Sequence, residues 1–235
     1  MFVERPNRGT VRHASSVYGA SRDGLPLTVW LPEDESPEIL ILASIHGDES
    51  ETTVVLSDAL RTIRRNGLRN AAVLCGNPDG LVQGTRGNAI GVDLNRNFPA
   101  SNWSPEPVYY KSRRDEPQDI ELSPGAHPAS EPETEALLSL LEQLKPRAVV
   151  SLHAALACID DADRSVLGRW ISARSGLPLE EDIGYPTPGS FGSWAGEQGL
   201  NLVTYELEAA SPYDLKNRHS PVLIELLTHK VELGE

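Results

Sequence analysis

The chain has 235 residues, 39% of them hydrophobic and 23% charged, and its formal net charge at pH 7 is −13. These values suit a globular protein with one sizeable α/β domain. They argue against nucleic acid or an anionic membrane surface as a partner, because both require a basic surface. No apolar stretch approaches the roughly 20 residues of a membrane-spanning helix.

The cysteines and the N-terminal residues indicate where such a protein acts. Cys75 and Cys158 both stand in apolar surroundings, in AAVLCG and ALACID, which favours reduced core residues over a disulfide. Residues 1–16, MFVERPNRGTVRHASS, lack the apolar centre of a secretory signal. The sequence therefore predicts a cytoplasmic protein with a single domain over residues 1–235.

Apolar runs and helical spacings predict strands that alternate with helices. The predicted strands are at residues 28–31, 38–45, 71–75, 148–152 and 201–207. The predicted helices are at residues 49–66, 130–144, 165–175 and 221–233. Ser130 and Glu133 have the spacing of a capping box at the start of the second of these helices. The alternation predicts an open, largely parallel sheet with helices on both faces.

Residues 76–125 contrast with these regular segments. They are rich in Gly, Pro, Asn and Arg and show little periodicity. Loops of this length are uncommon in compact domains unless they are functional. We therefore expect this segment to contribute to a binding or catalytic site.

Residues that can bind a metal or move a proton stand at the carboxyl ends of three predicted strands: His46, His153 and Glu206. Ligands bind at this end of the strands in open α/β sheets. His46 and Glu49 lie three residues apart across a strand-to-helix turn, so both can reach one point, and His153 could be the third ligand of a catalytic zinc. Taken alone, these residues leave two simpler interpretations open: acids that favour a helix N-terminus, and a hydrogen-bonded core histidine.

The order of short motifs is more specific than any of these residues. Along the chain the motifs are HGDE, NPDG, TRGN, GVDLNRNFP, SLHA, a tyrosine followed by PGSFGSW, and TYELE. This ordered set resembles the zinc metallocarboxypeptidase family over about residues 40–208. The resemblance implies a three-layer α/β/α sandwich with a mixed, mostly parallel central sheet, one Zn²⁺ per chain, and hydrolysis of an amide bond.

The resemblance also implies roles for individual residues. His46, Glu49 and His153 would bind zinc and leave one coordination position open. Glu206 in TYELE would be the general base, which takes a proton from water and delivers it to the leaving amine. Glu208 is the competing candidate, because residues two apart on a strand face the same side.

Further residues correspond to positions at which the family contacts its substrate. Arg86 matches the arginine that stabilises the tetrahedral oxyanion, and Asn95 and Arg96 match the pair that grips the free carboxylate of the substrate. Tyr185 matches a mobile tyrosine of the family, although two neighbouring prolines stiffen its loop. A structural role for Tyr185 stays open.

Four longer stretches resemble the bacterial amidases of murein peptides within this family: GVDLNRNFPASNW, SEPET, LACIDD and GYPTPGSFGSW. This narrower likeness implies cleavage of the γ-D-glutamyl–meso-diaminopimelate amide in a small anionic tripeptide, during the recycling of cell-wall peptides. A zinc deacylase of N-acyl amino acids shares the start of the HGDE motif and is one alternative. A catalytically inactive binding module of the same fold is another. The sequence does not indicate an oligomeric state.

Overall fold

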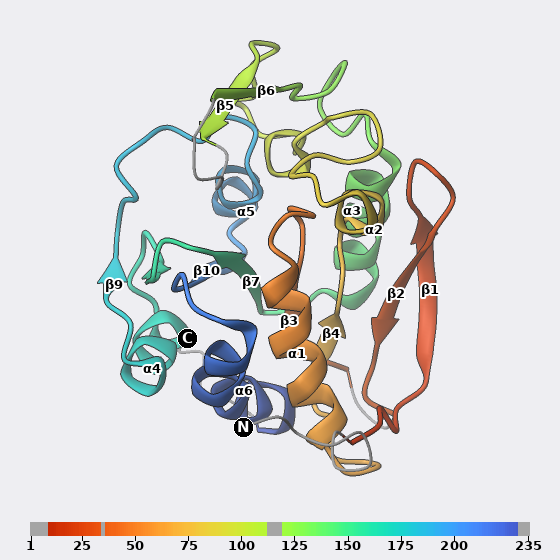
Figure 1. The fold of residues 1–235 in the computed structure, drawn as a ribbon, viewed down its shortest axis with the longest axis vertical. Coiled ribbons are helices and arrows are strands. Elements are labelled where there is room, and N and C mark those ends of the chain that lie inside the picture. The colour runs from red at the N-terminus through yellow and green to blue at the C-terminus, as the bar shows by residue number, and fades with distance from the viewer. Residues whose placement is uncertain (1–8, 34–35, 112–118, 230–235) are drawn as a thin grey trace.

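The computed structural model describes residues 9–33, 36–111 and 119–229, and an eight-stranded sheet runs through the middle of the fold (Figure 1). In sheet order the strands are β1 (Ser15–Ala20), β2 (Pro26–Trp30), β4 (Ala71–Val73), β3 (Ile39–Leu42), β7 (Ala148–Ala154), β10 (Asn201–Leu207), β8 (Cys158–Asp160) and β9 (Leu179–Glu180). β3 is parallel to β4 and β7, β7 is parallel to β10, and β8 is parallel to β9. The remaining neighbours are antiparallel, so the prediction of a mixed, mostly parallel sheet is confirmed.

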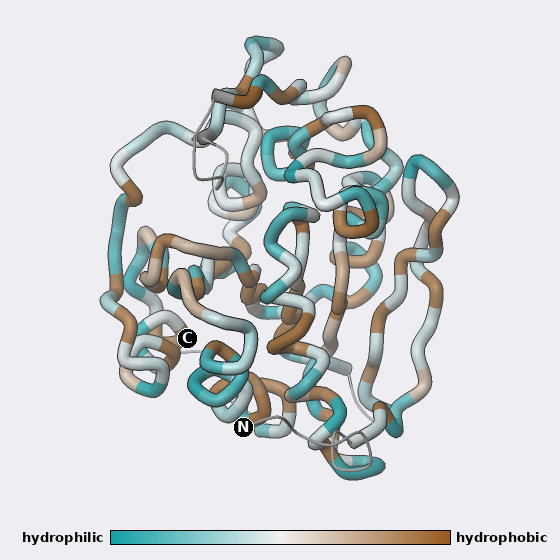
Figure 2. Tube along the Cα trace, in the orientation of Figure 1, coloured by the Kyte–Doolittle hydropathy of each residue, from teal (hydrophilic) through white to brown (hydrophobic). Residues whose placement is uncertain are grey.

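Helices cover both faces of this sheet (Figure 1). α1 (Ser50–Thr62), α4 (Val166–Ser175) and α6 (Pro212–Thr228) pack in one apolar core, and α3 (Pro132–Leu144) and α5 (Phe191–Gln198) pack in a second core on the opposite face. Hydrophobic residues concentrate along the central strands, whereas many of the peripheral turns are hydrophilic (Figure 2). The three-layer α/β/α sandwich is therefore confirmed.

The strand β7 shows how the two cores and a polar surface share one sheet. All its residues are buried, and successive side chains point to opposite faces. Val150 and Leu152 pack beneath α1, α4 and α6, whereas Val149 packs beneath α3 and α5. The alternation places Ser151 and His153 on the same face as Val149, further toward the carboxyl end of the strand. One face of β7 therefore changes from apolar core to polar side chains along its length.

The loop of residues 76–125 contains several short elements that the sequence did not predict. They are the helix α2 (Pro78–Gln83), the 3-10 turn η2 (Leu94–Arg96), and a hairpin of β5 (Val108–Lys111) and β6 (Asp119–Leu122). The hairpin is separate from the main sheet and lies beyond α5 in Figure 1. β1, β8, β9 and α5 were also not predicted, because their short or mixed sequences carry weak periodicity.

The predicted capping box of α3 is wrong. The helix begins at Pro132 with Glu131 at the N-cap, and the described residues include no side-chain hydrogen bond that caps it. Ser130 Oγ donates to Glu131 Oε1 at 2.9 Å instead. Glu133 Oε1 accepts from the backbone N–H of Arg22 at 2.8 Å. The two residues that were expected to cap the helix thus take other partners, one of them on the β1–β2 turn.

Two helix boundaries also differ from the prediction. α6 begins at Pro212, well before residue 221, and Ser211 Oγ caps it by accepting from the Asp214 backbone N–H at 3.2 Å. Proline is well tolerated in the first turn of a helix, so the Ser-Pro pair is the start signal that was missed. The predicted residues 230–233 lie outside the described residues. α1 ends at Thr62, because Ile63 has extended backbone geometry.

Cys75 and Cys158 are both free thiols in the structure. Their positions agree with the expectation of reduced residues. Among the described helices, none has both the length and the apolar character needed to cross a bilayer.

The turn after β3 requires a residue without a side chain. A Cβ on Gly47 would lie 2.1 Å from the carbonyl carbon of Gly80 and 2.3 Å from the backbone nitrogen of Leu81. The Gly47 N–H also donates to the carbonyl oxygen of Arg86 at 3.2 Å. The turn that carries His46 is therefore packed directly against α2 and the TRGN motif.

We expect Gly47→Ala to destabilise the protein, because the atoms facing the new methyl group belong to the backbone; overpacking typically costs about 1–3 kcal/mol. Gly196→Ala is the matched control. Gly196 lies inside α5 with open space around its Cα, and alanine is favoured over glycine in a helix by about 1 kcal/mol. Urea unfolding midpoints measure both changes. Wild-type stability of Gly47→Ala would contradict the close contact.

Candidate active site

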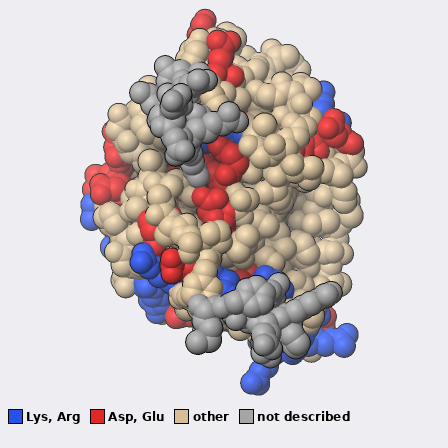
Figure 3. All heavy atoms as spheres, viewed as in Figure 1, with Lys and Arg blue, Asp and Glu red and all other residues tan. Residues whose placement is uncertain are grey.

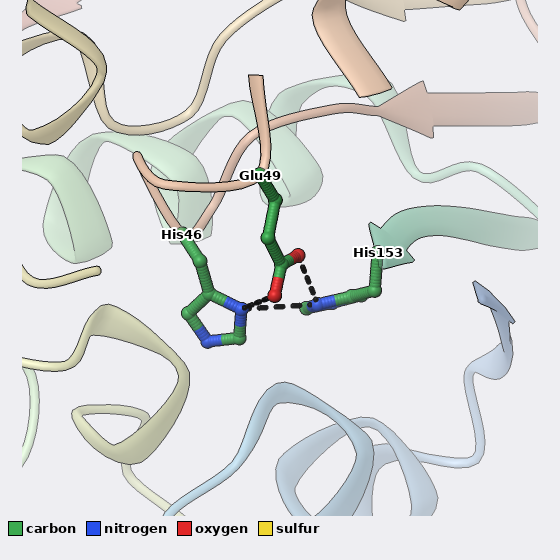
Figure 4. A group of neighbouring side chains, drawn as sticks. All are labelled: His46, Glu49 and His153. Carbon is green, nitrogen blue, oxygen red and sulfur yellow. Dashed lines mark hydrogen bonds and ion pairs between the residues drawn. The ribbon is translucent and has the colours of Figure 1, made fainter. Parts of the chain in front are cut away.

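Three predicted metal ligands converge in the structure (Figure 4). His46 follows β3, Glu49 is the N-cap of α1, and His153 lies near the end of β7. His46 Nδ1 lies 3.0 Å from Glu49 Oε1 and 3.1 Å from His153 Nδ1, and His153 Nδ1 lies 3.2 Å from Glu49 Oε2. All three side chains are buried.

This arrangement fits a zinc ion. Ligand atoms about 2.0–2.2 Å from a tetrahedral zinc are roughly 3.3–3.6 Å from one another, so the observed separations need to widen only slightly. Two imidazoles and one carboxylate are also the donor set of many catalytic zinc sites. Burial alone would raise the pKa of Glu49, but the neighbouring His46 and His153 lower it well below its ordinary value.

The second ring nitrogen of each histidine faces a polar partner. His46 Nε2 lies 3.3 Å from Asp93 Oδ1, and His153 Nε2 lies 3.0 Å from Ser151 Oγ. Such partners orient metal-binding histidines and leave the other nitrogen free for the metal. Asp93 and Ser151, which contact the candidate ligands, were not singled out from the sequence. The sequence did contain a signal for Asp93, because it is an acid between the apolar residues Val92 and Leu94 in the motif GVDLNRNFP.

Hydrogen bonds within the turn of residues 44–49 hold His46 and Glu49 in place. Ser44 has a positive φ of 46°, and its backbone N–H donates to Thr52 Oγ1 at 3.0 Å. Thr52 Oγ1 in turn donates to the carbonyl oxygen of Glu49 at 2.8 Å. The first turn of α1 and the end of β3 are thereby joined, which fixes the two ligands relative to each other.

Arg86 lies beside the metal ligands. Its Nε is 3.3 Å from Asp93 Oδ2, and one terminal nitrogen is 3.2 Å from Glu49 Oε1. Burial opposes the charge of the guanidinium, but Asp93 and Glu49 outweigh burial and raise its pKa. The guanidinium also lies 5.1 Å from the centre of the Tyr110 ring on the hairpin. Arg86 is thus a fixed positive charge next to the three ligands.

Arg96 and Asn95 lie on the η2 turn. The Asp93 side chain begins this turn by accepting from the Asn95 backbone N–H at 2.9 Å. Asn95 Oδ1 accepts from the Phe191 backbone N–H at 2.9 Å, which ties η2 to α5. Arg96 is 7% exposed, and burial lowers its pKa although Asp93 opposes that shift. A buried guanidinium of this kind is stabilised by an anionic ligand.

A cavity of about 990 Å³ brings together all eight predicted site residues, which are His46, Glu49, Arg86, Asn95, Arg96, His153, Tyr185 and Glu206. The cavity contains the metal ligands, an acid that is not a ligand, and two arginines. This combination can hold an anionic substrate beside a metal ion and move a proton there.

The two candidate bases have different surroundings. Glu206 lies on β10 opposite His153 of β7 and faces the cavity, where Oε2 accepts from the Leu156 backbone N–H at 3.3 Å. Burial raises its pKa. Glu208 comes after the last residue of β10, so strand alternation no longer applies, and its Oε2 lies 2.7 Å from His219 Nε2 of α6. The expectation that both acids face the same side is therefore wrong.

Two tyrosines line the cavity. The side chain of Tyr185 is 51% exposed, which does not suit a tyrosine that packs in the core. Burial of part of the ring and the charge of Glu206 raise its pKa. Tyr110 was not singled out in the sequence; its hydroxyl donates to Asp48 Oδ2 at 3.3 Å, next to the ligand Glu49. The hairpin β5–β6 therefore contributes to the wall of the cavity.

The sequence of this chain matches a protein family and is similar to proteins of known name. A model of the zinc carboxypeptidase family matches residues 6–159. Murein peptide amidase A of Escherichia coli strain K12 is 44% identical over 232 residues, which are 97% of this chain and 96% of the relative. Murein peptide amidase A of Vibrio campbellii is 38% identical over 234 residues, which are 99% of this chain and 94% of that protein.

Solved structures of an amidase and of a carboxypeptidase are also similar to this chain. The crystal structure of murein-tripeptide amidase MpaA from Escherichia coli O157 superposes with a TM-score of 0.90 at 41% identity, covering 97% of each chain. Carboxypeptidase A from Helicoverpa armigera superposes with a TM-score of 0.69 at 17% identity, covering 91% of this chain and 66% of that chain. At that identity the second match shows a shared fold alone.

We expect the protein to bind close to one zinc per chain, and His153→Ala to weaken that binding greatly, because one of three protein ligands is lost. His127→Ala is the control, since His127 is exposed and is not one of the converging ligands. Metal content after dialysis, measured by elemental analysis, gives the result. A fully loaded His153→Ala protein would remove His153 from the ligand set.

Proposed function

Because the chain belongs to the zinc carboxypeptidase family, we propose that it hydrolyses the amide between γ-D-glutamate and meso-diaminopimelate in the murein tripeptide L-Ala-γ-D-Glu-meso-diaminopimelate. The observation that carries the proposal is that one cavity brings together the three candidate zinc ligands, Glu206 and two arginines. The names of relatives that are similar over nearly their whole length support this substrate. We assign the activity to one catalytic domain over residues 1–235, acting in the cytoplasm on recycled cell-wall peptide.

The bond-breaking step uses residues on both sides of the scissile carbonyl. Zinc held by His46, Glu49 and His153 would supply a Lewis acid for the attack of water on that carbonyl. Glu206 takes a proton from the attacking water and delivers it to the leaving amine; its raised pKa suits a group that must both accept and donate. Arg86 donates hydrogen bonds to the developing oxyanion, and its pairing with Asp93 keeps it in position beforehand.

Recognition of the substrate uses the charge of its free carboxylate. Arg96 binds the α-carboxylate of diaminopimelate, and the amide nitrogen of Asn95 is available to the same group, since its Oδ1 is occupied by Phe191. Tyr185 closes the wall of the cavity near these residues. The scissile amide is thereby held between the metal ligands and Glu206, with the leaving amino acid toward Arg96.

The proposal is tested by incubating the zinc-loaded protein with the murein tripeptide and measuring released diaminopimelate by mass spectrometry. We expect release that stops when a chelator removes zinc and returns when zinc is restored. N-acetyl amino acids are the comparison substrates. Hydrolysis of these without release of diaminopimelate would identify a deacylase and contradict the proposal.

The choice of base gives a separate prediction. Glu206→Gln keeps the size of the side chain and removes the proton acceptor, so kcat should fall by about 10²–10⁴-fold while zinc content is retained. Glu208→Gln is the matched control. Its carboxylate contacts His219 and Arg218 on α6, so kcat should be little changed. The opposite pattern of losses in a steady-state assay would show that the wrong acid has been assigned.

A further inference from the structure

The floor of the cavity is a strip of polar side chains on one face of three neighbouring strands. Glu206 and Thr204 of β10 lie opposite His153 and Ser151 of β7, and Thr204 lies opposite Asp160 of β8 on the other side. Directly opposite residues in a sheet point to the same face. All five side chains line the cavity. The strip therefore extends from the metal ligand His153, past the base, to a carboxylate that the proposed chemistry does not use.

The Asp160 carboxylate has a different environment from the acids Asp161 and Glu181, which also line the cavity and have hydrogen-bonding or ionic partners. Asp161 Oδ2 accepts from both the backbone N–H and the hydroxyl of Ser165, the N-cap of α4, each at 2.7 Å. Glu181 Oε1 pairs with Arg164 at 2.9 Å. Within residues 9–33, 36–111 and 119–229, no group donates a hydrogen bond to the Asp160 carboxylate. It is partly buried in the cavity wall with its hydrogen-bonding capacity unused.

The surroundings of Asp160 disfavour its negative charge in the absence of a ligand. Burial raises the pKa of Asp160 to about 6, and the negative charges of Glu206 and Asp161 act in the same direction. A cationic group bound beside Asp160 would offset both effects. Acidic side chains also gather near the middle of the face shown in Figure 3. The cavity thus has positive charge at Arg86 and Arg96 and negative charge at Asp160.

We propose that Asp160 is a specificity-determining residue, which binds the distal ammonium group of the diamino acid that is released. This inference rests on the proposed function and adds the reason for preferring a diamino acid to a neutral one. Arg96 binds the α-carboxylate of the released diamino acid. The side chain of that diamino acid runs along the floor of the cavity toward β8. The ammonium then donates to the Asp160 carboxylate in a charge-assisted hydrogen bond.

The spacing of the floor suits a side chain of this length. Successive residues of a strand rise by about 3.3 Å, so Thr204 lies roughly 7 Å from Glu206 along β10, and Asp160 lies one strand further across. The scissile bond lies beside Glu206. A short methylene chain bridges a gap of this order, whereas a smaller residue leaves Asp160 without a partner.

The test uses three tripeptides that differ in the leaving residue: meso-diaminopimelate, L-lysine and L-norleucine. Lysine keeps the distal ammonium and lacks the distal carboxylate, and norleucine lacks both. We expect wild-type protein to cleave the first two with a kcat/KM at least about 10-fold above that for norleucine. Asp160→Asn should lower kcat/KM for the first two by about 10- to 100-fold, the range for a lost hydrogen bond to a charged group. For norleucine the change should be below about twofold.

Asp163→Asn is the matched control. It removes the same charge from an exposed side chain that lines the cavity, and it should leave kcat/KM for all three tripeptides unchanged. Asp160→Glu retains the charge and should retain the preference for lysine over norleucine. Zinc content and unfolding midpoint verify that each variant is folded.

The outcomes separate the two proposals. Wild-type protein that releases no diaminopimelate contradicts the proposed function, and the role of Asp160 with it. Wild-type protein that releases diaminopimelate but cleaves the norleucine peptide as fast as the lysine peptide overturns the role of Asp160 alone, whether or not any variant folds. The same conclusion follows if Asp160→Asn keeps the wild-type preference.

Discussion

Asp93 is fully buried, and its two carboxylate oxygens reach three parts of the site. Oδ1 lies 3.3 Å from His46 Nε2 and accepts from the Asn95 backbone N–H, and Oδ2 lies 3.3 Å from Arg86 Nε. Burial alone would raise the pKa of Asp93, but Arg86 and His46 lower it, so the group stays charged. A buried charge is stable when it is paired and hydrogen-bonded, and here that requirement holds a metal ligand, Arg86 and the η2 turn in one arrangement.

The same constraint gives the two arginines of the cavity different surroundings, in a protein with a net charge of −13. Interactions at a binding site depend on charges within a few ångströms more than on the distant surface, because salt screens the latter. Arg86 is neutralised by Asp93 and Glu49, whereas Arg96 makes its close hydrogen bond to a neutral carbonyl, that of Asn95. Within the described part of the chain, Arg96 therefore lacks the direct carboxylate contacts that Arg86 makes, although the charge of Asp93 acts on both arginines.

Much of this arrangement could be predicted, because the informative residues are local in sequence. The strands and the helices behind them follow from apolar runs, and the ligands His46, Glu49 and His153 stand where strands end. The ordered motifs identified the family, which periodicity alone could not have done. The structure places these ligands, Glu206 and the two arginines in one cavity.

The features that were missed depend on contacts between distant parts of the chain. The capping box failed because Glu133 bonds to Arg22 on another element, which no local pattern reveals. The expectation that Glu206 and Glu208 face the same side failed because the strand ends between them. The hairpin β5–β6 and the strand β8 are too short for periodicity to identify. The position of Asp160 in the cavity follows from the pairing of β8 with β10, which the sequence does not reveal.

The floor of the cavity has a consequence for what single substitutions there can change. His153 and Glu206 lie at the ends of their strands, whereas Thr204 and Asp160 lie one pleat behind them on the same surface. Among the described residues, the side chains of Thr204 and Asp160 make no hydrogen bond to those of His46, Glu49, His153 or Glu206, although both line the same cavity. A change of side chain at either of these two positions therefore reshapes the cavity wall without removing a hydrogen bond of the candidate ligands or of Glu206.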